Sequence, residues 1–98
     1  MVQQDFFLYD EESGEKEVII PLQSALIKIE VPEGVNISAQ GKLAKESQVY
    51  NALMGVKSND LKTYISMTNG LFSIDVNGIY SVKFNSDAVS TIKIKMLG

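Results

Sequence analysis

The sequence predicts a small all-β protein, an antiparallel β-sandwich of about eight strands with an immunoglobulin-like or jelly-roll arrangement. Three observations lead to this fold class. Apolar and polar residues alternate with a period of two through most of the chain. Turn-forming residues recur about every ten positions. The chain has 98 residues, which is enough for one hydrophobic core, so we expect a single domain spanning residues 1–98.

The first half of the chain contains one clear strand and two short apolar runs. In residues 25–31 the odd positions are apolar, while Lys28 and Glu30 fall on the opposite face. The apolar runs are residues 6–9 and 18–20, and turns are expected within residues 10–15 and 32–34. Residues 41–55 lack a clear period. We expect a loop there followed by a strand at 48–53, with a helical turn as the alternative.

The second half is predicted to form strands at residues 61–67, 71–76, 79–85 and 91–96, with a further turn at 85–87. Two Asn-Gly pairs, at 69–70 and 77–78, punctuate these strands. Asn-Gly favours type I′ hairpin turns because both residues tolerate a positive φ angle. We therefore expect a meander, in which Asn77-Gly78 closes a tight hairpin and Asn69-Gly70 joins the preceding strand in the same way.

The composition argues against an enzyme. The chain has no Cys, His, Trp or Arg, and its nine basic residues are all Lys. The commonest general base, the commonest metal ligand and the thiolate nucleophile are therefore all missing. The acidic run in residues 10–17 is typical of a solvated turn, and Asp75 and Asp87 have no predicted cleft that would make them a hydrolytic pair. We expect no catalysis, no cofactor and no metal site.

The charge and hydropathy patterns exclude further classes of function. A net charge of −3 opposes nucleic-acid binding, which requires a basic surface. The apolar runs are only a few residues long, so no membrane span is expected, and the N-terminus lacks the pattern of a signal peptide. The absence of Cys fits synthesis in a reducing cytoplasm.

Several predicted strands carry apolar residues on both faces. Leu26, Leu71 and Ile79 fall on faces that the alternation assigns to solvent. Local bends, a covered edge strand or isolated surface residues would explain this pattern. A subunit contact would also explain it, and for that role the candidate residues are Phe6, Phe7, Tyr9, Leu71 and Ile79. We expect a homo-oligomer, with a trimer as the first hypothesis, and changing Leu71 and Ile79 together to Lys should weaken assembly without unfolding the chain.

Residues 69–84, followed by Ile92-Lys93-Ile94-Lys95, resemble the C-terminal half of small β-sandwich virion proteins of tailed bacteriophages. These are capsid decoration, head-fibre and tail accessory proteins, in which a Gly, an aromatic residue, a Val-Asp-Val-like strand, a second Gly and a basic residue recur. Lys83 stands where those proteins often carry Arg. The resemblance implies a non-enzymatic virion protein, made in the host cytoplasm, whose partners are capsid or tail proteins.

A carbohydrate-binding module for host-surface attachment is the alternative function. Exposed aromatic side chains commonly stack on sugars, and the alternation around Tyr64 leaves its side chain on a face that is expected to be exposed. Tyr64 is therefore the candidate glycan-binding residue.

Overall fold

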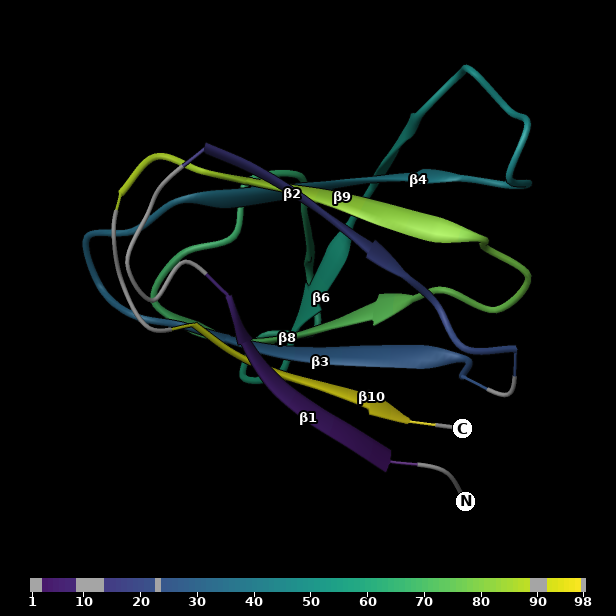
Figure 1. Cartoon of the computed structure of the whole chain (residues 1–98). Helices are drawn as coiled ribbons and strands as arrows, with labels where there is room; N and C mark the ends of the chain where they lie inside the picture. The colour runs from purple at the N-terminus through teal and green to yellow at the C-terminus, as the bar shows by residue number, and fades with distance from the viewer. Residues whose placement is uncertain (1–2, 9–13, 23, 89–91, 98) are drawn as a thin grey trace.

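The computed structural model describes the backbone of residues 3–8, 14–22, 24–88 and 92–97, and the side chains of these residues except 3–8. These residues form two stacked antiparallel sheets and contain no helix (Figure 1). The strands are β1 (Gln3–Leu8), β2 (Gly14–Ile19), β3 (Leu26–Val31), β4 (Ile37–Lys42), β5 (Asn51–Leu53), β6 (Gly55–Lys57), β7 (Thr63–Tyr64), β8 (Gly70–Asp75), β9 (Ser81–Ser86) and β10 (Ile92–Leu97). The predicted all-β sandwich is confirmed.

The order of the strands identifies the sandwich as a jelly roll. One sheet has the order β1-β10-β3-β8-β6-β7, and the other has the order β2-β9-β4-β5. Strands pair in a nested series: β1 with β10, β2 with β9, β3 with β8, and β4 with β5. Such nesting results when one long antiparallel hairpin is rolled into two sheets. The short β6–β7 hairpin is an insertion that lengthens the first sheet beyond β8.

The predicted meander is wrong at both Asn-Gly pairs. β8 pairs with β3 and β6, whereas β9 pairs with β2 and β4, so the segment between them crosses from one sheet to the other. Gly78 has a φ of 82° but Asn77 has no positive φ, and the Ile79 N–H donates to the Val76 carbonyl at 3.0 Å. This is a type II turn, not the hairpin type I′.

The other Asn-Gly pair also makes no hairpin. Asn69 has a positive φ of 50°, as Asn readily tolerates, but β7 pairs with β6 and not with β8. The strand predicted at residues 61–67 is reduced to the two residues of β7, after which Met67 forms an isolated bridge to Ile37 in β4. Alternation specifies which face of a strand is buried, and it leaves the neighbouring strand undetermined.

The hydrophobic core lies between the two sheets and includes the alternating apolar residues predicted in β3, β8 and β10. In the predicted strand 61–67 the alternation was wrong, because Leu61 and Ile65 are exposed and only Met67 of its apolar set is buried. Ile27 and Ile29 of β3, Ile74 of β8, and Ile92 and Ile94 of β10 are all buried. Burial of such side chains stabilises the fold by about 1.5–3 kcal/mol each. The segment after β4 is a loop that leads into β5, as the sequence predicts, and it contains no helix.

Candidate functional site

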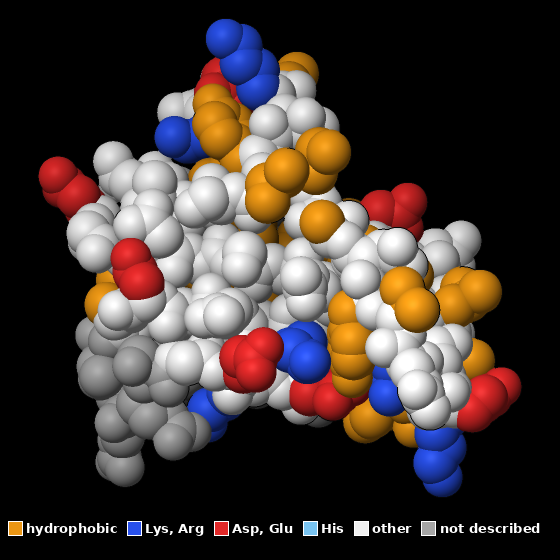
Figure 2. Space-filling model, turned by 90° about the horizontal axis from the view of Figure 1, so that it is seen from above, with side chains coloured by type: hydrophobic (Ala, Val, Ile, Leu, Met, Phe, Trp, Pro, Cys, Tyr) orange, Lys and Arg blue, Asp and Glu red, His pale blue; other side chains and the backbone are white. Residues whose placement is uncertain are grey.

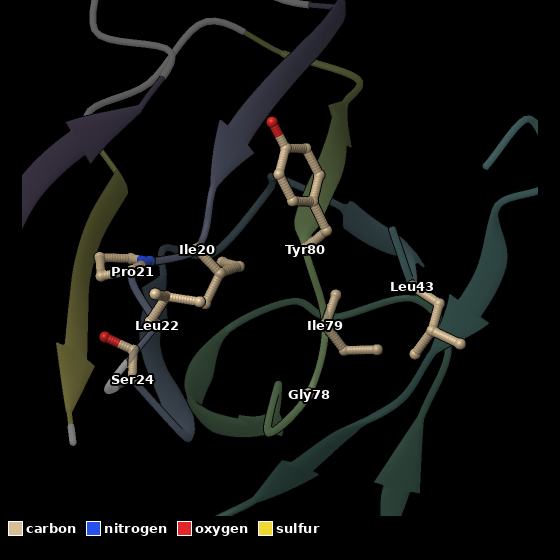
Figure 3. A pocket seen from close by; sticks show the side chains of 8 residues that line it. All are labelled: Ile20, Pro21, Leu22, Ser24, Leu43, Gly78, Ile79 and Tyr80. Atoms are coloured by element: carbon tan, nitrogen blue, oxygen red, sulfur yellow. The ribbon is translucent and has the colours of Figure 1, made fainter. Parts of the chain in front are cut away.

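An apolar cleft lies at one end of the sandwich, where three connections between strands meet. They are the β2–β3 connection, the residue that follows β4, and the β8–β9 turn (Figure 3). The cleft has a volume of about 160 Å³. Its lining residues are Ile20, Pro21, Leu22, Ser24, Leu43, Gly78, Ile79 and Tyr80.

Backbone hydrogen bonds tie the three connections together. The Ile20 N–H donates to the Tyr80 carbonyl at 2.9 Å, and the Tyr80 N–H donates to the Lys42 carbonyl at the same distance. A further bond runs from the Ser24 N–H to the Pro21 carbonyl at 2.9 Å and closes a turn in the β2–β3 connection. The walls of the cleft are therefore held in place by the main chain, so binding would require little ordering of loops.

The size and lining of the cleft indicate what it can accept. In Figure 3, Leu22 and Ile20 lie across from Ile79 and Leu43. Leu22 is 103% exposed and Leu43 is 72% exposed, so apolar surface extends over the rim. Pockets for small-molecule ligands typically measure about 300–1,000 Å³, whereas a cavity of about 150 Å³ holds one benzene ring. The cleft therefore fits one large apolar side chain.

A cluster of polar and aromatic side chains borders the cleft on the outer face of the four-stranded sheet. Glu17 accepts hydrogen bonds from the Ser81 hydroxyl at 2.6 Å and from the Tyr50 hydroxyl at 2.9 Å. The Lys83 ammonium lies 3.9 Å from the centre of the Tyr50 ring. The Lys42 ammonium lies 3.8 Å from Glu17 and 5.7 Å from the centre of the Tyr80 ring, which connects the cluster to the cleft.

The cluster contains one carboxylate, that of Glu17, and two ammonium groups, those of Lys42 and Lys83. The hydrogen bonds from Ser81 and Tyr50, followed by the charges of Lys42 and Lys83, hold the pKa of Glu17 below its usual value. Figure 2 looks down on this side of the molecule, where the middle is mainly white and hydrophobic side chains gather towards the projecting lobes. The middle of this face is therefore a polar, solvated surface, and the exposed hydrophobic side chains lie at its margins.

The structure separates the two described residues of the predicted interface. Ile79 lies in the cleft, is partly buried and packs against the core. Leu71 is 43% exposed and lies near the start of β8, whereas Ile79 follows the end of that strand. Because Ile79 contacts the core, Lys at position 79 would disturb folding, so the double change to Lys does not isolate assembly. The side chains of Phe6 and Phe7, and the whole of Tyr9, lie outside the described residues.

Tyr64, the candidate glycan-binding residue, is half-buried and not fully exposed. Its ring packs edge-on against Phe72 with centroids 5.8 Å apart, and its hydroxyl donates to Asp60 at 2.5 Å. This hydrogen bond raises the pKa of Tyr64 and lowers the pKa of Asp60. The lysine ammonium nearest to the ring belongs to Lys57, at 5.8 Å from its centre.

The two carboxylates considered for hydrolysis do not form a pair. Asp75 accepts a hydrogen bond from the Asn77 N–H at the cleft end of the sandwich. Asp87 follows the far end of β9 and binds both the backbone and the side-chain amide of Asn36, which lowers its pKa. Within the described ranges, no three His, Cys, Asp or Glu side chains gather where they could hold a metal ion.

Sequence reasoning did not select Leu22, Leu43 or Tyr50 as site residues. Leu22 follows Pro21 in the connection between β2 and β3, where the sequence pattern predicted no turn, and Leu43 directly follows β4. An apolar residue in a polar connection was the available signal, but isolated surface apolar residues are common. No local signal links Tyr50 to Glu17, because 33 residues separate them.

The fold and the cleft define a class: a jelly-roll β-sandwich whose end presents a preformed apolar cleft of side-chain size. Neither a family model nor a curated protein sequence matches this chain. Two solved structures share its fold. The SPBc2 prophage-derived protein YomS matches with a TM-score of 0.78 and 17% identity, over 99% of this chain and 94% of that one.

The second structure is that of the PBSX exported protein XepA, with a TM-score of 0.76 and 15% identity. It matches 97% of this chain but only 37% of its own length, so this chain corresponds to little more than a third of XepA. At these identities the likeness establishes the fold. A β-sandwich of the kind found in phage-derived proteins, which the sequence resemblance implied, is thereby confirmed. The described residues also contain no helix long and apolar enough to cross a membrane.

Proposed function

We propose that this chain is a non-enzymatic structural protein of a phage virion, a capsid decoration or accessory head or tail component. The observation that carries the proposal is the end-to-end correspondence of fold with a prophage-derived protein of nearly the same extent. Because one fold can serve many functions, the site has to support the proposal as well. It does so through a rigid apolar cleft and exposed leucines at its rim, which suit a protein contact.

In this role the chain attaches to other virion proteins by burying apolar anchors. One large side chain that fills the cleft would contribute about 1.5–3 kcal/mol to binding. Anchors of this kind in well-packed pockets dominate the energetics of protein interfaces. The proposal includes self-association, with a trimer as the first hypothesis, and synthesis in the host cytoplasm before incorporation into the particle.

The test is to find the protein in purified particles. Phage particles would be produced from the host that encodes the chain, treated with nuclease, banded on a density gradient and washed at high salt. Quantitative mass spectrometry should then find the chain at a fixed number of copies per major capsid protein. If the chain stays in the soluble fraction and is absent from banded particles, the virion proposal is wrong.

A carbohydrate-binding module remains the second candidate, because jelly rolls also serve as lectin domains and Tyr64 has a carboxylate beside it. Its support is weaker, since one edge of the Tyr64 ring packs on Phe72 and the hydroxyl is already bonded to Asp60. A glycan-binding screen, with Tyr64→Ala as the control variant, separates the two candidates.

A further inference from the structure

Leu61, in the connection between β6 and β7, has an unusual combination of exposure and backbone strain. Its side chain is 77% exposed, so a large apolar group faces solvent. Its φ is +58°, a left-handed conformation that is unfavourable for a residue with a bulky side chain. Gly or Asn would avoid both costs. Because the Leu61 side chain is exposed and does not pack in the core, its strained conformation suggests a functional role.

The surrounding turn holds Leu61 rigidly in this conformation. The Leu61 N–H donates to the Lys57 carbonyl at 2.8 Å, and the Lys57 N–H donates to the Lys62 carbonyl at 2.9 Å. Asp60 accepts hydrogen bonds from the Lys62 N–H at 2.9 Å and from the Tyr64 hydroxyl. The Tyr64 ring in turn packs against the core residue Phe72. The turn is therefore preorganised, and an anchor displayed on it would lose little conformational freedom on binding.

We propose that Leu61 is an interface anchor whose partner is a second copy of this chain, and that it inserts into the end cleft of that copy. This inference rests on the self-association proposed above, and it specifies which surfaces of the two copies meet. The cleft volume of about 160 Å³ suits one large aliphatic side chain, and Leu22, Leu43 and Ile79 supply apolar walls. Because the turn and the cleft are different surfaces, the contact is head-to-tail.

The charges next to the two surfaces are complementary. Residues 57–62 contain two ammonium groups, those of Lys57 and Lys62, and one carboxylate, that of Asp60, so the turn has a net positive charge. At the same end of the sandwich as the cleft, Asp75 is exposed as the last residue of β8, three residues before the cleft residue Gly78. Lys42, the basic group beside the cleft, is paired with Glu17. A turn of net positive charge therefore meets the end of the sandwich that carries the exposed carboxylate of Asp75, which favours the contact.

Disulfide trapping tests the contact directly, because the chain has no Cys of its own. Two single variants of the full chain, Leu61→Cys and Leu43→Cys, would be mixed and oxidised mildly, and the mixed disulfide quantified by mass spectrometry. The matched control replaces Leu43→Cys with Glu33→Cys, since Glu33 is exposed at the opposite end of the sandwich. We expect the mixed disulfide with Leu43→Cys and little with Glu33→Cys. Equal yields, or none with Leu43→Cys, would overturn the inference.

Leu61→Asn tests the energetics, because Asn is close to Leu in size and tolerates a positive φ. Light scattering over a concentration series should show that self-association weakens about tenfold or more, while Tm is unchanged or raised. Leu71→Asn is the control and should leave association unchanged. If Leu71→Asn weakens association and Leu61→Asn does not, the named contact is wrong, although self-association stands. A strictly monomeric wild-type chain, together with Cys variants that form no mixed disulfide, would also refute the contact. The virion proposal is tested separately, by the presence of the chain in purified particles.

Discussion

Gly55, the first residue of β6, is a position where one added methyl group should have a large effect on stability. A Cβ there would overlap the sulfur of Met67 and lie 3.1 Å from the Cβ of Phe72. Both neighbours are fully buried, and the Phe72 Cβ is fixed to the main chain of β8. Overpacking of this kind costs about 1–3 kcal/mol. We therefore expect Gly55→Ala to lower the free energy of unfolding by that amount, measured by urea denaturation.

The same change at Gly70, the first residue of β8, is a matched control. A Cβ there would lie 2.8 Å from the Cε of Lys57, near the flexible end of a side chain, and 3.6 Å from the ring of Phe72. Because the Lys57 side chain can move, Gly70→Ala should change stability by no more than about 0.5 kcal/mol. Because Ala restricts the unfolded chain equally at both positions, equal losses at the two glycines would contradict the assignment of the Gly55 effect to the clash.

A double-mutant cycle identifies the atom responsible. Met67→Ala removes the overlapping sulfur and itself costs about 2–5 kcal/mol, because it leaves a cavity in the core. In that background Gly55→Ala should cost clearly less than in the wild-type chain, since only the approach to Phe72 remains. If the penalty of Gly55→Ala is the same in both backgrounds, the reasoning from the Met67 contact is refuted.

Two further predictions concern the outer face and the β8–β9 turn. Glu17→Gln should lower stability at pH 7 by about 0.5–1.5 kcal/mol, because Glu17 accepts hydrogen bonds from Ser81 and Tyr50. The pKa of Glu17 in the folded chain lies below its usual 4.5, so this stabilisation is present above that value and lost as the pH falls through the folded pKa. The urea midpoints of Glu17→Gln and wild type should therefore converge in acid; a constant difference would contradict the pKa argument. Gly78→Ala should cost about 1 kcal/mol through its φ of +82° alone, as no other atom lies near the added Cβ, and Gly78→Asn should cost less. Equal unfolding free energies for Gly78→Ala and wild type would show that the positive φ is not required.

The sequence by itself determined which side of each main strand is buried. Ile27 and Ile29 in β3, and Ile92 and Ile94 in β10, lie in the core as their alternation with Lys and Glu predicts. This information is local, because successive side chains of a strand point to opposite faces whichever strand lies alongside. The all-β class was predictable for the same reason, whereas the loop before β5 was expected because residues 41–55 lack a clear period.

Only the tertiary structure decided which strands are neighbours and where the site lies. The turn at Asn77-Gly78 has the residues of a hairpin, yet it crosses between sheets because β8 is paired with β3 and β9 with β2. The cleft brings Leu22, Leu43 and Ile79 together from three distant connections. The conformation of Leu61 depends likewise on hydrogen bonds from its neighbours in the turn. Strand neighbours, the cleft and the turn around Leu61 all depend on packing between distant segments or on hydrogen bonds between particular backbone groups. A local pattern of apolar and polar residues specifies neither of these.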